Sequence, residues 1–521
     1  MKQNLFFVLV AMVLSIPYQA QADRTVSIDS GRLLGAILDD GVRVFKGIPY
    51  AAPPVGELRW RAPKALQGWE GIRSATEFGS ICPQPSGLAA MSGGLLPKAD
   101  EDCLFLNVWT PALSADESLP VMVWIHGGGL FLGWSNQSGY DGQKIANQGV
   151  VLVSINYRLG PLGFLAHPAL TKEAGSSGNY GFMDQVAALE WVERNISSFG
   201  GNPNQVTIFG ESAGGTSVMT LLSSSSAKGL VDGAIAQSPW FTENNVAKLA
   251  GEASAETMGS TWTEAIASGK GLAALRQIPA EGLVGDGKVD LPMYVTVDGD
   301  FLSSSVESIF ARGEQLDVPL IVGTNADEGT MFVTMEGYDN RADFEKGLRD
   351  IYGDAATAML DLYPVTEDKE VRGAVNQWLT DTWFLRAARV FLDSASKKIS
   401  PAYQYHFTRA VPGNTLGAHH GAELRYVFNT LVGQSTFGGS TAAEDLALAE
   451  SIIAYWTQFA KAGNPNHIGL ERWSEYGATR SYLELGDNIR TGRALGAQRL
   501  DQLEANRRTA KLTEPPSSAP R

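Results

Sequence analysis

The stretch QVTIFGESAGGTSVMTLL, residues 205–222, contains the pattern that decides the fold. Residues 205–209 have the apolar, β-branched character of a buried strand, and residues 215–222 have the apolar content of a helix. Between them, residues 210–214 fit the pattern Gly-x-Ser-x-Gly, in which a sharp turn from strand to helix exposes the serine. Small flanking residues let such a strained turn pack closely against neighbouring backbone. The stretch therefore predicts that Ser212 is an exposed nucleophile.

Strand and helix signals alternate along the central half of the chain. This alternation is typical of an α/β protein whose central, mostly parallel sheet is flanked by helices. The predicted strands are 121–125, 150–155, 206–209, 233–236, 318–322 and 402–407, and the predicted helices are 183–196, 212–222, 381–394 and 444–460. We find no internal repeat and no linker, so residues 23–507 are expected to form one catalytic domain with loop and helical insertions.

The composition excludes one class of partner. The chain has 521 residues and a formal net charge of −15, and no cluster of Lys and Arg that would create the positive field needed by a nucleic-acid-binding protein. Hydrophobic residues make up 44% and charged residues 19%, which is ordinary for a globular enzyme.

The first residues have the pattern of an export signal. Lys2 gives a positive start, residues 5–16 are apolar, and Ala20-Gln21-Ala22 is a small-x-small cleavage site. The apolar run is shorter than the roughly 20 residues that cross a bilayer. We therefore expect residues 1–22 to be a cleaved signal peptide, with no stable membrane anchor afterwards and the mature protein periplasmic or secreted. Residues 508–521, rich in Pro and Ser, are expected to be a disordered tail.

Cys82 and Cys103 are the two cysteines of the chain. In an exported protein an even pair is typical of a disulfide. Closing a loop of about 20 residues should stabilise the fold by roughly 3 kcal/mol.

A serine nucleophile needs a base and an acid that orients it. In folds with this elbow, the acid and then the base follow the serine along the chain. His126 and His167 precede it, His406 lies inside a predicted strand, and His467 lies in a surface segment. This leaves His419 and His420, between which sequence order does not choose.

The acid is expected in the loop after the strand 318–322. Asp327 and Glu328 follow that strand, and either carboxylate could hold an imidazole in the required tautomer.

Donors for the oxyanion are expected from three consecutive glycines, residues 127–129, which follow the predicted strand 121–125. Glycines there let backbone N–H groups approach a substrate with no Cβ in the way.

Several separate segments resemble the type-B carboxylesterase and cholinesterase family of α/β-hydrolases, which includes bacterial para-nitrobenzyl-esterase-like enzymes. The segments are 45–54, 58–60, 101–108, 156–160 and 178–185. The resemblance implies Glu328 as the acid, and His420, which precedes a Gly-Ala-Glu-Leu segment, as the base.

The resemblance also implies the supporting residues. Backbone N–H groups of Gly128, Gly129 and Ala213 are expected to bind the oxyanion. Ser238 and Glu211 are expected to support the triad from outside. The family's disulfide corresponds to Cys82 and Cys103.

The implied activity is that of a serine carboxylesterase that hydrolyses small-molecule esters through an acyl-enzyme, with no cofactor and no metal. An alternative is a specialised hydrolase of a polyester natural product or xenobiotic. A non-catalytic binding protein of the same fold is disfavoured because all three triad residues are present. Trp134, Trp240 and Phe241 follow the expected catalytic segments, so they are candidates to line the pocket, with core packing as the alternative.

Overall fold

The computed structural model describes residues 24–86, 96–242, 245–285, 293–431 and 441–509. The expected signal peptide lies outside the described residues. Of the expected tail, residues 508 and 509 form the end of helix α18 (Ala497–Thr509), and the rest lies outside the described residues.

An eleven-stranded sheet forms the centre of the molecule. Its strands, in spatial order, are β16 (Arg490–Arg493), β15 (Ser481–Leu485), β14 (Ala402–Phe407), β13 (Leu320–Asn325), β10 (Gly233–Gln237), β9 (Gly201–Glu211), β7 (Leu119–Ile125), β8 (Val151–Ile155), β6 (Phe105–Thr110), β4 (Arg43–Pro49) and β3 (Ala36–Ile37). The strands from β8 to β15 run parallel, and the flanking pairs are antiparallel. The predicted α/β fold with a mostly parallel sheet is confirmed, and each predicted strand overlaps one of these strands.

Among the described residues, two smaller sheets lie outside the central one. β1 (Thr25–Ile28), β2 (Gly31–Leu34) and β5 (Ile72–Ser74) form one, and β11 (Val246–Lys248) pairs with β12 (Val295–Val297) in the other.

Helices cover both faces of the central sheet, as the strand β7 illustrates. Its residues Val121, Val123 and Ile125 belong to a core shared with α6, α7 and α15, whereas Met122 and Trp124 belong to a core shared with α3, α16 and α17. Alternate residues of a strand point to opposite faces, so a continuous apolar run is needed here. These helices are α3 (Gln143–Ala146), α6 (Tyr180–Asn195), α7 (Ala213–Leu222), α15 (Arg386–Ala395), α16 (Leu424–Val427) and α17 (Ala443–Ala462).

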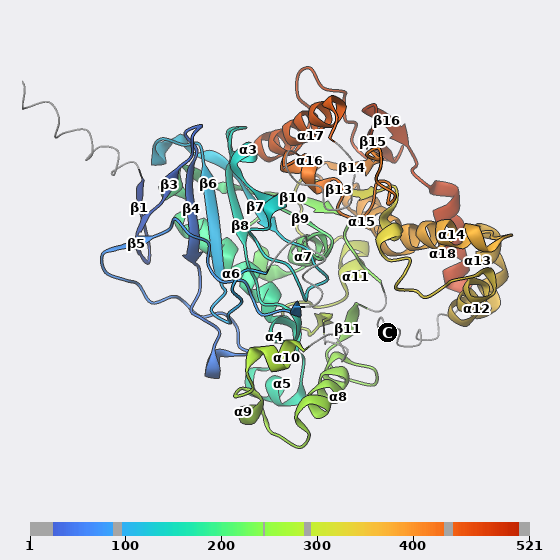
Figure 1. Cartoon of the computed structure of the whole chain (residues 1–521), viewed down its shortest axis with the longest axis horizontal. Coiled ribbons are helices and arrows are strands. Elements are labelled where there is room, and N and C mark those ends of the chain that lie inside the picture. Colours follow the sequence, from blue (N-terminus) through green and yellow to red (C-terminus); the bar gives the residue numbers. More distant parts are fainter. Residues whose placement is uncertain (1–23, 87–95, 243–244, 286–292, 432–440, 510–521) are drawn as a thin grey trace, which may run out of the picture.

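The insertions form two helical lobes at the rim (Figure 1). One contains α4 (Gly160–Phe164), α5 (Pro168–Ala174), α8 (Ala255–Ala267), α9 (Leu272–Leu275) and α10 (Ala280–Val284), which share a small core. The other contains α12 (Arg341–Tyr352), α13 (Ala356–Leu362), α14 (Val371–Leu379) and α18, which share another. The helix α11 (Val306–Ala311) contacts α15.

The carboxyl ends of the parallel strands carry the expected site residues. Ser212 follows β9, Ser238 follows β10, and Glu328 follows β13 after a short turn. The loop after β14 contains His420, and the loop after β7 contains the three glycines. Because parallel strands end at the same edge of a sheet, the topology brings these loops to one place. No helix among the described residues is long and apolar enough to span a bilayer.

Candidate active site

Ser212 occupies a strained turn between β9 and α7. Its φ is +58° and its ψ is −121°, a conformation that costs energy for a residue with a side chain. The turn is held by the Ser212 N–H, which donates to the carbonyl of Gln237 at 2.9 Å. A Cβ on Gly214 would lie only 2.1 Å from the Ile125 carbonyl oxygen, so the small residues of the elbow are a requirement of packing.

Glu328 and His420 are hydrogen-bonded to each other. The Nδ1 atom of His420 lies 2.6 Å from Oε2 of Glu328, which is fully buried. The other carboxylate oxygen, Oε1, accepts from the Ser238 hydroxyl at 2.5 Å and from the Asn325 N–H at 2.7 Å. Three donors thus surround the Glu328 carboxylate and fix its orientation.

The neighbouring alternatives, His419 and Asp327, have different surroundings. The Nδ1 atom of His419 faces the carbonyl of His420 at 2.8 Å. The Asp327 carboxylate accepts from the Ala418 N–H at 2.9 Å and from the Asn376 side-chain amide at 3.2 Å. Asp327 therefore ties its own loop to the histidine loop, while Glu328 contacts the imidazole.

The Nε2 atom of His420 faces the elbow. It lies 3.2 Å from Oε1 of Glu211, the residue before Ser212. Within the described residues Nε2 has no hydrogen-bond partner, so the imidazole and the Ser212 hydroxyl are not bonded to each other. Bonds of this kind are often long in a ligand-free site and shorten when substrate binds.

Charge within the site shifts two pKa values. Burial acts to lower the pKa of His420, but the carboxylates of Glu211 and Glu328 outweigh it and raise the pKa to about 9. Burial raises the pKa of Glu211 to about 8, although the His420 imidazole opposes this shift. Because each group changes the charge seen by the other, the two titrate as a pair.

The glycine loop approaches the elbow closely. A Cβ on Gly127 would lie 3.1 Å from Cβ of Ser212. Gly128 and Gly129 have φ values of +103° and +61°, which favour glycine. Ala213 is the first residue of α7, so its N–H has no acceptor within the helix. The glycine loop and the start of α7, which carry the three expected oxyanion donors, thus lie at the Ser212 elbow.

His126 supports this loop from behind. Its ring stacks on Tyr157 at 4.5 Å, and its Nδ1 atom faces the Gly127 carbonyl at 2.8 Å. Burial lowers the pKa of His126 to about 4, so the ring is neutral at physiological pH.

The disulfide is confirmed and lies beside the glycine loop. Cys82 and Cys103 are bonded, with 5.0 Å between their Cα atoms. Gln84 joins the two regions, because its side chain donates to the Gly133 carbonyl at 3.0 Å and accepts from the Gly133 N–H at 2.9 Å.

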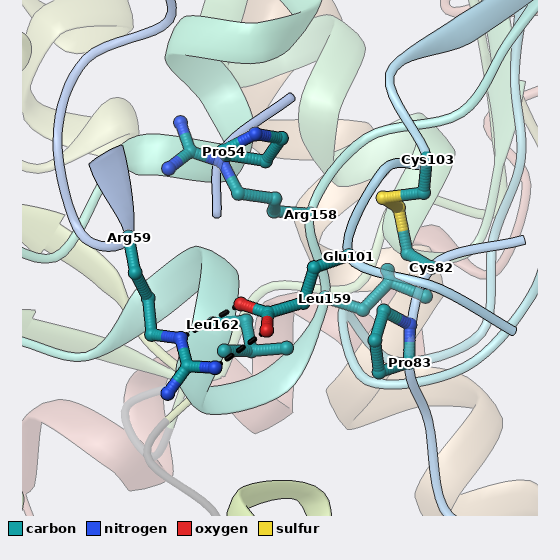
Figure 2. A pocket seen from close by; sticks show the side chains of 9 residues that line it. All are labelled: Pro54, Arg59, Cys82, Pro83, Glu101, Cys103, Arg158, Leu159 and Leu162. Carbon is teal, nitrogen blue, oxygen red and sulfur yellow. Dashed lines mark hydrogen bonds and ion pairs between the residues drawn. A yellow bond between two sulfur atoms is a disulfide. The ribbon is translucent and has the colours of Figure 1, made fainter. Parts of the chain in front are cut away.

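Figure 2 shows a cavity beside this disulfide, where Arg59 pairs with Glu101. Its volume of about 10 Å³ is enough for roughly one water molecule. It is too small to be the substrate site.

Two features of the site were not predicted from the sequence. Glu423, in the segment that follows His420, accepts from the side-chain amides of Asn325 at 2.6 Å and Gln237 at 2.8 Å. Its position beside the histidine was the available signal, but its two partners are distant in sequence.

The second feature is an aromatic cluster against the imidazole. The rings of Phe384 and Phe332 lie 4.8 and 5.2 Å from the His420 ring. Trp383 lies 5.4 Å from Phe332 and 5.9 Å from Trp240, which places Trp240 at this cluster.

The other two candidate pocket aromatics are buried. Phe241 packs against Phe391, 5.1 Å away, in the main core, so core packing describes it. Trp134 is 6% exposed.

Comparisons with known proteins agree over nearly the whole chain. Residues 22–503 match the sequence model of the Carboxylesterase family. The fumonisin B1 esterase of Sphingopyxis macrogoltabida is 35% identical, with 92% of this chain and 90% of that protein covered. The para-nitrobenzyl esterase of Bacillus subtilis is 36% identical, with 89% of this chain and 95% of that protein covered. The human cocaine esterase is 35% identical, with 90% of this chain and 89% of that protein covered.

Solved structures show the same relationship. A PNB esterase superposes with a TM-score of 0.81 at 34% identity, covering 92% of this chain and 99% of that one. A structure titled thermophylic PNB esterase gives a TM-score of 0.82 at 34% identity, covering 92% of this chain and 100% of that one.

Proposed function

Since this chain belongs to the carboxylesterase family and is a carboxylic ester hydrolase, we propose that Ser212, His420 and Glu328 carry out its reaction. The observation that carries this proposal is the 2.6 Å bond between His420 and Glu328, with the opposite ring nitrogen facing the Ser212 elbow. A serine hydroxyl is a weak nucleophile unless a base removes its proton during attack.

In the first half of the reaction, Ser212 Oγ attacks the ester carbonyl carbon while Nε2 of His420 takes the hydroxyl proton. The tetrahedral intermediate then collapses, and Nε2 returns that proton to the departing alkoxide, which leaves as an alcohol. In the second half, water attacks the acyl-serine, its proton passes to Nε2, and the same proton is returned to Ser212 Oγ as the carboxylic acid leaves.

Glu328 acts through the imidazole. Its bond to Nδ1 keeps the proton on that nitrogen, so Nε2 presents a lone pair to the serine. When Nε2 becomes protonated, the carboxylate stabilises the resulting charge. Ser238 and Asn325 hold the carboxylate in place for this role.

The N–H groups of Gly128, Gly129 and Ala213 are the proposed donors to the oxyanion. Such donors act where negative charge develops, and each typically contributes about 3 kcal/mol to lowering the barrier. The positive end of α7 adds to this field.

The experiment that tests this proposal compares Ser212→Ala with a matched serine on the same helix. Ser223, the residue at the carboxyl end of α7, bonds the Met219 carbonyl. We expect Ser212→Ala to lose about a thousandfold or more in kcat on p-nitrophenyl acetate, with unchanged thermal unfolding. Ser223→Ala should keep its activity. Near-normal turnover by Ser212→Ala would contradict the assignment.

The substrate class remains broad in this proposal. The names of the relatives refer to fumonisin B1, para-nitrobenzyl and cocaine esters, which are chemically unlike one another. These names favour small-molecule carboxylic esters as the substrate class. The similarity to the fumonisin B1 esterase favours, as a second candidate function, a hydrolase specialised for one natural product. A kcat/KM panel of simple p-nitrophenyl esters and natural polyesters separates the two.

We also propose that the protein is exported after cleavage of residues 1–22. The support is the charged start, the apolar run and the Ala-x-Ala site, together with a disulfide, which is typical of oxidising compartments. Mass spectrometry of the protein from cell fractions should find an amino terminus at Asp23 in the periplasm or medium. An intact amino terminus on cytoplasmic protein would contradict this.

A further inference from the structure

A π-helical turn, Thr380–Leu385, joins α14 to α15. The sequence predicts an ordinary helix over 381–394, but the turn is wider than an α-helical one. A π turn inside a helix is rare and is frequently found at functional sites. The turn Thr380–Leu385 contacts three parts of the molecule: the loop of Glu328, the ring of His420 and the helix α18.

On one side the turn contacts the loop that carries Glu328. The Thr380 hydroxyl accepts from the N–H of Gly329, the residue after Glu328, at 3.1 Å. The same hydroxyl donates to Asn376 at 3.3 Å, and the Asn376 amide donates to Asp327 at 3.2 Å. The turn therefore holds the acid loop on both sides of Glu328.

On the second side the turn contacts the triad base. Phe384 is 1% exposed, and its ring lies 4.8 Å from the His420 ring. Phe332 completes the contact at 5.2 Å from His420 and 6.0 Å from Phe384. A shift of the turn would thus move the Phe384 ring that packs against the His420 imidazole.

On the third side the turn is tied to the carboxyl-terminal helix α18. Asp381 is fully buried, and Arg499 of α18 grips both oxygens of its carboxylate, through Nε and, at 3.0 Å, through Nη2. Tyr363 and Gln377 donate to the same carboxylate at 3.1 and 3.2 Å. A two-pronged Arg–carboxylate pair fixes geometry as well as charge.

We propose that Arg499 and Asp381 are positioning residues for ester hydrolysis, which fix the π turn so that Thr380 and Phe384 hold Glu328 and His420 in register. This inference rests on the proposed roles of Glu328 and His420. The connection runs from α18, which contacts α13, to α15, which contacts β13 of the sheet (Figure 1). The carboxyl-terminal helix is thereby a part of the active-site support.

The energetic reason is the buried charge of Asp381. Without Arg499, the carboxylate would be buried with neutral donors alone, which is strongly unfavourable. We therefore expect the turn to rearrange so that the carboxylate reaches water. Small displacements of catalytic groups cost turnover severely, about a hundredfold for roughly 1 Å.

A matched control is present on the same helix. Asp501, two residues from Arg499, pairs with Arg389 of α15. This pair is outside the π turn, and Asp501 is largely exposed, with 61% of its side-chain surface accessible. Asp501→Asn removes an α18 ion pair without touching Asp381.

The experiment measures kcat and KM for p-nitrophenyl acetate well below the unfolding temperature, in full-length Arg499→Gln, Arg499→Lys and Asp501→Asn. We expect Arg499→Gln to lower kcat about 10- to 100-fold, with little change in KM. Arg499→Lys keeps the positive charge but cannot bond both oxygens of Asp381 as a guanidinium does, so its kcat should fall less. Asp501→Asn should match the wild type. A kcat unchanged in Arg499→Gln, or lowered equally in Asp501→Asn, would overturn the inference.

The double variant Asp381→Asn/Arg499→Gln provides a second test. Because it leaves no unpaired buried charge, its loss of kcat should be smaller than that of Arg499→Gln alone. A loss of kcat equal to or larger than that of Arg499→Gln would overturn the inference. If Arg499→Gln does not fold, Arg499→Lys and Asp501→Asn are compared, and equal kcat values in the two would overturn it.

Ser212→Ala in the same assay separates this inference from the proposed function. Activity retained by Ser212→Ala removes the proposed triad, whereas an inactive Ser212→Ala beside a fully active Arg499→Gln removes only the positioning role.

Discussion

Nε2 of His420 lies 3.2 Å from Oε1 of Glu211, so the imidazole stands between two carboxylates. The Glu328 carboxylate is surrounded by donors, whereas Oε1 of Glu211 has no hydrogen-bond partner among the described residues. A negative charge on Glu211 would therefore stabilise the protonated imidazole of His420, which is the form that cannot act as a base.

The first prediction concerns the pH dependence of Glu211→Gln. Activity requires neutral His420, so kcat/KM rises as pH passes the pKa of the imidazole. The nearby carboxylates raise that pKa to about 9. Removing the Glu211 charge removes part of this stabilisation of the cation, so the rising limb should move to lower pH. The measurement is kcat/KM of a neutral ester across acidic and alkaline pH.

The control for this shift is Glu484→Gln, which changes a partly buried carboxylate, far from the His420 ring, that pairs with the exposed Arg490. It should leave the rising limb where it is. A limb that stays in place in Glu211→Gln would mean that Glu211 is uncharged in the active enzyme.

The second prediction distinguishes the two adjacent histidines. His420→Ala removes the ring that contacts Glu328 and should cost about a thousandfold or more in kcat. His419→Ala removes a ring whose Nδ1 faces the His420 carbonyl, so we expect a smaller loss, below about tenfold, from a slightly displaced loop. Both are measured on one ester. A larger loss at His419 would reverse the assignment.

The central elements of the fold were predictable because their signals are local. Apolar runs such as 121–125 and 402–407 became β7 and β14, and the elbow around Ser212 joins β9 to α7 as predicted. The parallel order of these strands then places the following loops at one edge. Local pattern and topology were sufficient for this much.

The rest depends on contacts between distant residues. Glu423 accepts a hydrogen bond from Gln237, 186 positions away, and no local sequence pattern predicts that bond. The π turn falls inside a stretch whose apolar spacing reads as an ordinary helix, because one widened turn hardly changes the periodicity. The antiparallel pairs β3–β4 and β15–β16 are short, so their alternation is too brief to detect.

The third prediction concerns Ser238→Ala. The variant removes one of three donors to the buried Glu328 carboxylate. A hydrogen bond to a charged group is worth about 1.5–3 kcal/mol, and part of this loss should appear in turnover because the carboxylate then holds the imidazole less firmly. We expect kcat to fall roughly tenfold, since 1.4 kcal/mol corresponds to that factor.

Ser224→Ala is the matched control for Ser238. Ser224 is equally buried, but its hydroxyl donates to the Phe301 carbonyl. It should lose stability in thermal unfolding and keep kcat. Equal kcat values in the two variants would remove the supporting role of Ser238.

The fourth prediction concerns the disulfide. Cys82→Ser/Cys103→Ser opens a loop with a sequence separation of 21, which should cost about 3 kcal/mol of stability. Because Gln84 bonds both the N–H and the carbonyl of Gly133, part of the effect should reach the glycine loop and lower kcat as well. Urea unfolding and kcat are measured together, with Gln84→Ala as the variant that cuts the link and leaves the disulfide intact. An unchanged kcat in both the disulfide variant and Gln84→Ala would show that the disulfide does not affect the oxyanion loop.

The last prediction concerns the aromatic cluster beside His420. Trp383 is partly exposed and contacts both Phe332 and Trp240, so its indole bounds the space next to the imidazole. Trp383→Ala should admit longer chains and raise the kcat/KM ratio of p-nitrophenyl octanoate to acetate by roughly tenfold, the lower end of what a methylene-sized change in a pocket discriminates. Phe78→Ala, at an exposed ring that contacts Lys46 far along the sheet, is the control and should leave the ratio unchanged. A ratio that moves equally in both variants would show that Trp383 does not bound the substrate, because only a ring that touches the ester can distinguish one chain length from another.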